Sequence, residues 1–173
     1  MADNFYKQLG IGVSSVTFGV MLAVFIFTAG MGNVNSPQAV LLFATSFLLT
    51  ISLWWQHSDL FVKSLQSHNV WHFVFDFAVS FLGIMAVIFV NDLQIWLLIG
   101  IMTMLSSAVR CMLQWDKSSK AIKSKLKETF FVAVGLSMIL DVIYIASYSM
   151  SGVFLSVLVF IIALIFVAHP SIK

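Results

Sequence analysis

About six apolar runs, each long enough to cross a lipid bilayer, divide this sequence of 173 residues. A transmembrane helix needs roughly 20 predominantly apolar residues. Hydrophobic residues make up 61% of the chain and charged residues only 9%, whereas about 25% of the residues in an ordinary soluble domain are charged. The sequence therefore predicts an all-α fold: a polytopic membrane protein with six transmembrane helices in a single domain, residues 1–173.

Short turn-forming segments separate the apolar runs. Helices are expected at about residues 9–30, 38–57, 70–90, 93–113, 126–148 and 153–168. The Gly- and Pro-containing segment 32–37 and the pair Asn91-Asp92 are expected to be turns. The basic linker 115–128 is interpreted as a solvated loop, with a short amphipathic helix on an anionic membrane surface as the alternative.

The lysines and arginines predict the orientation in the membrane, because cytosolic loops carry an excess of them. With six helices, one side holds the N-terminus, the second and fourth connections and the C-terminus. These segments contain all 9 Lys and Arg residues, namely Lys7, Lys63, Arg110, Lys117, Lys120, Lys123, Lys125, Lys127 and Lys173. We therefore expect both termini to be cytosolic. A plasma membrane is the expected location.

Three ionisable residues lie inside the expected spans, where a charge is costly unless it is paired or hydrated. Asp76 in the third helix and Arg110 in the fourth lie at similar depth, since the hairpin at 91–92 makes these helices antiparallel neighbours. We predict that they form an ion pair. Asp141 has no basic residue at its depth, so it is protonated, hydrogen-bonded to a group such as Tyr144, or exposed to water.

The sequence carries no pattern that indicates catalysis. No nucleophile motif, phosphate-binding loop or paired-carboxylate site is visible, so we do not expect an enzyme. His68 and His72 share a helix face if the third helix begins early, but further metal or haem ligands are not evident and no cofactor is expected. The formal charge of +2 is too small to indicate a nucleic-acid partner.

The first expected helix carries a stripe of small residues on one face. Its members are Gly12, Ser15, Gly19, Ala23 and Gly30. Small residues let helices approach closely in lipid. This helix is therefore expected to pack closely against another helix, and it could also surround an axis with its symmetry mates or line a path.

The second expected helix ends in Trp54, Trp55, Gln56 and His57, as a helix does at the headgroup region. Its pattern S-F-x-x-x-x-x-x-W-x-x-H-x-x-L-F resembles the potassium channel family called transmembrane protein 175, found in lysosomes and bacteria. The matching residues are Ser46, Phe47, Trp54, His57, Leu60 and Phe61. The family's first-helix motif, an arginine followed by F-S-D, is replaced here by Leu9 and Val13-Ser14-Ser15, so only Ser14 matches.

This resemblance implies a homotetrameric, potassium-preferring cation channel with the first helix around the axis. It implies that a hydrophobic constriction is formed by Thr17, Val20, Val24 and Phe27. It also implies a structural or gating network in the helices behind the pore. We place in that network Ser14, Trp54, His57, Asp76, Arg110 and Asp141. Potassium ions, the lipid bilayer and further copies of the chain are the expected partners.

Two other functions fit the same sequence. In a small proton-coupled secondary transporter, Asp141 and the group of His72, Asp76 and Arg110 would carry the coupling. Transporters often interrupt helices with Gly or Pro, whereas both prolines here, Pro37 and Pro170, lie at helix ends. In a non-transporting accessory subunit, Asp141 would be a helix-packing contact.

Overall fold

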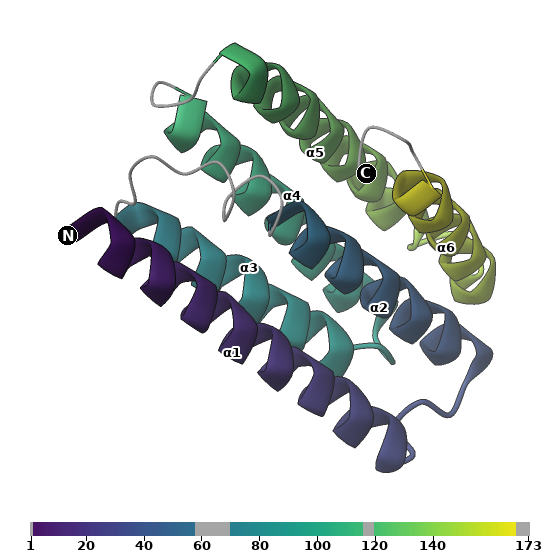
Figure 1. Ribbon diagram of the computed structural model, residues 1–173. Coiled ribbons are helices and arrows are strands. Elements are labelled where there is room, and N and C mark those ends of the chain that lie inside the picture. Colours follow the sequence, from purple (N-terminus) through teal and green to yellow (C-terminus); the bar gives the residue numbers. More distant parts are fainter. Residues whose placement is uncertain (1, 58–69, 116–119, 169–173) are drawn as a thin grey trace.

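The chain folds into a bundle of helices (Figure 1). The structure, a computed structural model, describes residues 2–57, 70–115 and 120–168, without the side chains of residues 2–11, 13, 14, 55–57, 70–73, 76 and 121. The six helices are α1 (Ala2–Gly30), α2 (Pro37–His57), α3 (Val70–Ile88), α4 (Leu93–Trp115), α5 (Lys120–Ala146) and α6 (Gly152–Ala168). The all-α fold class is confirmed.

Helices α1 and α5 both begin earlier than expected, at Ala2 instead of about residue 9 and at Lys120 instead of about residue 126. Most of the predicted linker 115–128 belongs to α5. Lys, Ala, Ile and Leu have moderate to high helix propensity, and nothing in the segment interrupts the helix. Ile122 packs with Leu126 and Cys111 in a small apolar cluster, so this apolar edge of the segment faces α4.

Three helices contain stretches long and apolar enough to cross a membrane. These stretches are Pro37–Trp54 in α2, Leu93–Trp115 in α4 and Ile122–Ala146 in α5. Within the described residues, the other three helices contain the shorter apolar stretches Ser15–Gly30, Phe77–Ile88 and Gly152–Ala168. The chain thus has the character of a membrane protein with transmembrane helices.

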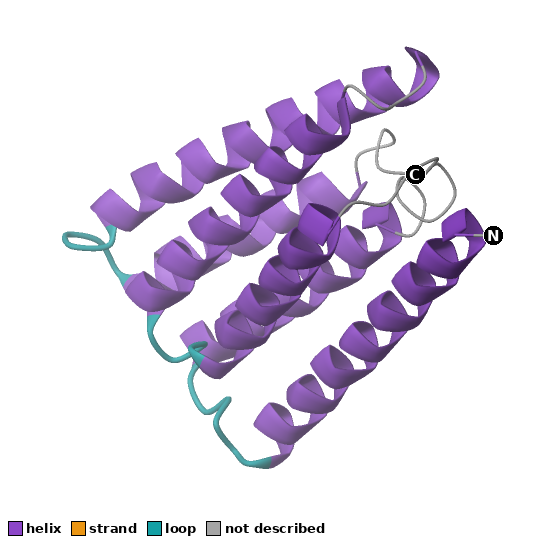
Figure 2. Ribbon diagram, turned by 90° about the vertical axis from the view of Figure 1, so that its left-hand side faces the viewer, coloured by secondary structure: helices purple, strands orange, loops and turns teal. Residues whose placement is uncertain are grey.

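The connections after α1, α3 and α5 lie together at one end of the bundle (Figure 2). After α1, Gly32 adopts a left-handed φ of 69°, and Ser36 caps α2 by accepting a hydrogen bond from the Ala39 amide at 3.1 Å. Asp92 caps α4 through the Ile95 amide at 3.0 Å. The expected turns at 32–37 and 91–92 are therefore confirmed.

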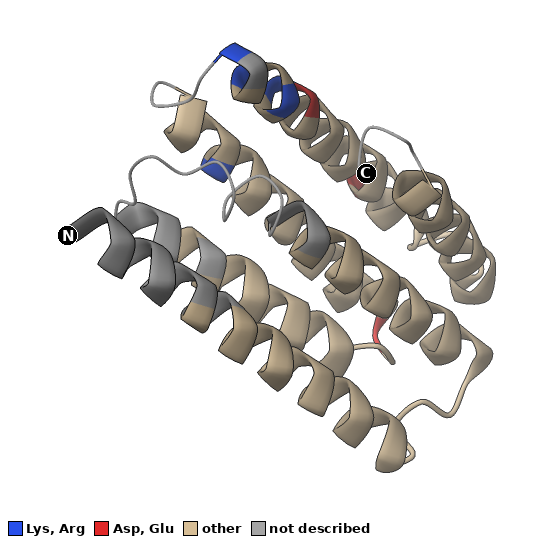
Figure 3. Cartoon of the chain, in the orientation of Figure 1, with Lys and Arg blue, Asp and Glu red and all other residues tan. Residues whose placement is uncertain are grey.

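The opposite end of the bundle carries the described basic side chains, and we call it the basic end (Figure 3). It consists of the last turns of α4 with Arg110 and the first turns of α5. The described lysines there are Lys120, Lys123, Lys125 and Lys127.

Helix α4 occupies the centre of the bundle between α3 and α5, while α6 packs on α2 and α1 packs mainly on α3. The main core lies in the half away from the basic end, around Trp96, Leu97 and Leu42. Two glycines permit close packing near this core. The Met21 side chain occupies the space beside Gly83, and a Cβ atom at Gly100 would lie 3.2 Å from Leu140 Cδ1.

Candidate functional site

The α2 residues that carry the family resemblance make specific contacts. Ser46 Oγ donates to the Leu42 carbonyl at 2.9 Å and accepts a hydrogen bond from Trp96 Nε1 at 2.8 Å. The Phe47 ring meets the Phe25 ring edge-on, with centroids 5.3 Å apart. This motif therefore ties α2 to the central helix through a hydrogen bond and to α1 through an aromatic pair.

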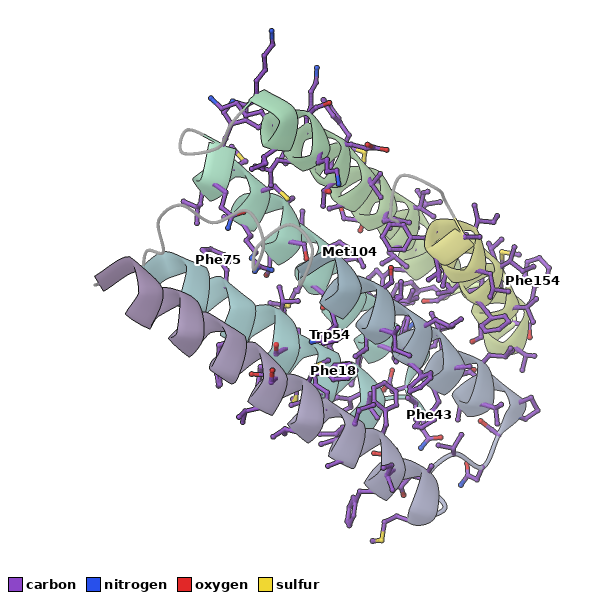
Figure 4. All side chains as sticks on the ribbon, viewed as in Figure 1. Phe18, Phe43, Trp54, Phe75, Met104 and Phe154 are labelled. Carbon is purple, nitrogen blue, oxygen red and sulfur yellow. The ribbon has the colours of Figure 1, made fainter. Side chains whose placement is uncertain are left out.

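Trp54 provides a second aromatic link to α1. Its indole stacks on Phe18, with ring centroids 4.5 Å apart and an interplanar angle of 22° (Figure 4). Phe25 also contacts Phe43 at 5.2 Å. Such pairs contribute about 0.5–1.5 kcal/mol beyond their buried area. The side chains of Ser14 and His57 lie outside the described part of the structure, so their role in a polar network stays a prediction.

Helix α1 presents one face to the outside of the bundle. This face, which we call the α1 outward face, is exposed at Gly12, Ser15, Val16, Gly19, Val20, Ala23, Ile26, Phe27 and Gly30. It contains every member of the predicted stripe of small residues. A Cβ atom added at Gly12, Gly19 or Gly30 would meet nothing within 4 Å. The packing of this chain on itself therefore does not require glycine at these positions.

The four predicted pore-lining residues do not all share this face. Val20 is 47% exposed and Phe27 is 64% exposed, and both lie on the α1 outward face. Val24 is half-buried, and Thr17 lines an interior cavity instead. Residues 17 and 24 lie about a third of a turn around the helix from the centre of the outward face, as the rotation of about 100° per residue requires.

The interior cavity has a volume of about 120 Å³ and lies among α1, α2, α3, α4 and α5. Each of these helices contributes at least one hydroxyl group to its wall. The residues are Thr17, Ser46, Thr50, Ser80, Thr103, Ser107 and Thr129. Ser46, Thr103 and Ser107 already donate to backbone carbonyls of their own helices, so bound water or a ligand can add hydrogen bonds only to their oxygen atoms as acceptors.

Sequence reasoning did not predict this cavity. The sequence feature that could have indicated the cavity is a pair of hydroxyl residues one helical turn apart in an apolar segment. Two such pairs are Ser46 with Thr50 and Thr103 with Ser107. Such pairs also occur where helices merely pack. Only the fold shows that both pairs face the same space.

Arg110 lines the cavity at the basic end and is only 7% exposed. It interacts with another group of the chain. The predicted partner, Asp76, lies one turn before the cavity-lining Ser80 in α3, but its side chain is outside the described part, so the ion pair stays a prediction. Among the described residues, no three His, Cys, Asp or Glu side chains form a group that could hold a metal ion.

Asp141 does not line the cavity, because it lies on the exposed side of α5. Its predicted hydrogen-bond partner, the Tyr144 hydroxyl, pairs instead with the Tyr148 hydroxyl at 2.9 Å. The structure therefore separates Asp141 from Arg110, two residues that sequence reasoning placed in one network.

Comparisons with known proteins identify no relative of this chain. No family model, curated protein or solved structure matches the chain. The resemblance to the transmembrane protein 175 family rests on the α2 motif, and function has to be argued from the geometry.

Proposed function

We propose that the chain is a subunit of a potassium-preferring cation channel, in which four copies surround a pore lined by α1. In this arrangement all six helices span a prokaryotic plasma membrane, and both termini lie in the cytosol. The α1 outward face is the single observation that carries the proposal. It combines small and aliphatic side chains on a helix whose opposite side is fixed to the bundle.

The small residues on this face favour assembly with further copies. Glycine lowers the stability of a helix interior by about 1 kcal/mol relative to alanine, and the chain's own packing does not require it at Gly12 or Gly19. In lipid, helices associate through close van der Waals packing, which small side chains permit. Symmetry mates of α1, meeting at these glycines, explain their presence.

Val20 and Phe27 are the lining residues that the geometry supports best, because both project from the exposed face of α1. Rings of apolar side chains can pass ions together with a few water molecules and can close by dewetting. Thr17 and Val24 lie toward the flank of the helix, where they support the constriction from behind.

The distribution of charge supports the proposed topology. The described lysines and Arg110 lie at the basic end, whereas the three short connections lie at the other end and contain none. A basic end in the cytosol agrees with the general excess of Lys and Arg on the cytosolic side of membrane proteins.

The experiment is passive ion flux from proteoliposomes that contain the purified protein, under potassium and then sodium gradients, with a proton ionophore to dissipate opposing charge. We expect protein-dependent flux that favours potassium. Val20→Ser should increase the flux about tenfold, because a hydroxyl ring lowers the barrier to wetting. Val74→Ser is the matched control, since Val74 is also 47% exposed but belongs to α3 and not to α1; it should leave flux unchanged.

Absence of flux from folded, oligomeric protein would contradict the channel. So would equal responses to the substitutions at Val20 and Val74.

The interior cavity favours a second candidate, a small secondary transporter. Its hydroxyl-lined wall reaches from the core to Arg110 within a single chain, as a substrate path near the middle of the bilayer would. Asp141 faces away from this cavity, so it does not belong to the path. If Ser80→Leu abolishes gradient-driven uptake into proteoliposomes while Val20→Ser changes neither uptake nor passive flux, the result favours the transporter over the channel. Variants that change only stability would instead favour the accessory subunit.

A further inference from the structure

We infer that the interior cavity binds a small monocarboxylate, with the carboxylate at Arg110 and a short apolar chain toward the core. The site is complete within one chain and does not use the α1 outward face. The inference therefore does not depend on the proposed channel, and either can fail without the other.

Arg110 is the charged side chain of the described cavity wall. It is the only Lys or Arg among the described lining residues, and Asp and Glu are absent from that same part of the wall. Its guanidinium presents five N–H donors in a planar fork that matches a carboxylate. Arg110 already interacts with another group of the chain, and the number of its donors lets it serve a second acceptor as well.

The Ser107 and Thr103 hydroxyls near Arg110 already donate their protons to backbone carbonyls, so they do not donate to a ligand. Ser107 Oγ donates to the Thr103 carbonyl at 3.0 Å, and Thr103 Oγ1 donates to the Ile99 carbonyl at 2.8 Å. Their protons are thus already used within α4, and this part of the wall is only weakly polar. A ligand whose carboxylate reaches Arg110 can therefore place its apolar chain along this part of the wall.

The rest of the wall is apolar, which argues against a fully polar solute. Large side chains from three helices contribute to it. They include Phe18, Met21, Leu49, Leu53, Trp54 and Met104. Such a surface favours apolar atoms over water, by about 25 cal/mol for each Å² buried. The described wall thus combines an arginine at one end with an apolar body.

The size of the cavity limits the ligand. An apolar cavity of about 150 Å³ in another protein accommodates benzene, and the volume here is about 120 Å³. The wall follows α4 from Trp96 to Cys111, so the space is elongated. A straight-chain acid of about six heavy atoms, such as butyrate, fits both limits.

The test uses the full-length protein in lipid nanodiscs, titrated with sodium butyrate. Trp54 and Trp96 line the cavity, so intrinsic tryptophan fluorescence reports on its occupancy, and the melting temperature gives a second readout. We expect a saturable change with butyrate that sodium chloride of equal ionic strength does not cause. Butyramide has the same shape but no charge, and it should bind about tenfold more weakly because a charge-assisted bond to arginine is lost.

Two adjacent serines provide a matched pair of variants. Ser107 lines the cavity and Ser106 does not, while both are half-buried in α4. Ser107→Leu should weaken butyrate binding at least about tenfold, because the larger side chain occupies space that the ligand needs. Ser106→Leu should leave it unchanged. Arg110→Lys should also weaken binding, because lysine cannot form the bidentate contact.

Several results would overturn the inference. No saturable response to butyrate would exclude the site, and an equal response to butyramide would show that charge is not recognised. A titration unchanged by Ser107→Leu would place the ligand elsewhere. If the Arg110 variant fails to fold, the comparison of Ser107→Leu with Ser106→Leu still decides. Val20→Ser should not alter the butyrate titration, which separates this site from the proposed pore.

Discussion

Helices α4 and α1 are both apolar, yet they relate to the bundle in opposite ways. Helix α4 packs against α3 on one side and α5 on another, and it buries ten of its residues. Helix α1 is attached along one side and exposes the other. Their glycines show the difference, since Leu140 fills the space beside Gly100 in α4, whereas nothing in the chain approaches Gly19 in α1. The comparison teaches that α4 is a scaffold within the subunit, while the exposed glycines of α1 have no packing role in it.

The largest effect is expected from truncating the central helix at its most buried large side chain. Trp96→Ala should lower the free energy of unfolding by about 3–5 kcal/mol, because it leaves a cavity in the main core. Ile26→Ala on the α1 outward face should change it by no more than about 0.5 kcal/mol. Unfolding of the purified protein in mixed micelles measures both. Equal losses would break the distinction between scaffold and exposed helix.

A smaller effect is expected from the hydrogen bond that joins α2 to α4. Ser46→Ala leaves the buried Trp96 Nε1 without its acceptor, which should cost about 1–3 kcal/mol. Ser156→Ala is the control, because the Ser156 hydroxyl is equally buried but donates only to the Gly152 carbonyl of its own helix. The same unfolding measurement applies. A loss at Ser156 as large as that at Ser46 would show that the contact to Trp96 contributes little.

The sequence was sufficient to predict the helices, because apolar runs and turn residues define them locally. Turns at Gly32 and Asn91 follow from backbone freedom and capping, and both were predicted. The starts of α1 at Ala2 and of α5 at Lys120 were not predicted, because polar and charged residues there indicated non-helical segments although their helix propensity is adequate. Local sequence carries the hydropathy of a segment more clearly than its exact ends.

The candidate sites were less predictable, because they depend on how helices face one another. The small stripe of α1 was recognised, but its exposure became evident only in the fold. Thr17 was expected on the pore face, yet the rotation of α1 turns it toward the cavity. Apolar residues on every side of a helix leave its rotation undetermined, and this is why the cavity was missed.

The aromatic link between α1 and α2 should have a moderate effect. Phe18→Leu removes the stack on Trp54 and should lower stability by about 1 kcal/mol beyond the area lost. Phe77→Leu is the control, since its ring lies 6.5 Å from Phe81 on an exposed face. Thermal unfolding followed by tryptophan fluorescence measures both changes. If the two variants behave alike, α1 is held by its contacts with α3 and not by the aromatic residues of α2.

The smallest effect on the subunit is expected at Gly19, where the effect on assembly should be greatest. Gly19→Leu enters open space, so the stability of the single subunit should stay constant or rise by up to about 1 kcal/mol through helix propensity. A bulky side chain there would nevertheless hold symmetry mates of α1 apart, and the oligomer should dissociate. Gly135→Leu in α5 also enters open space and is the matched control, which should leave the mass of the particle unchanged. Light scattering from protein in detergent measures that mass. An oligomer that survives the change at Gly19 but not the change at Gly135 would move the assembly surface from α1 to α5, and with it the axis of any pore.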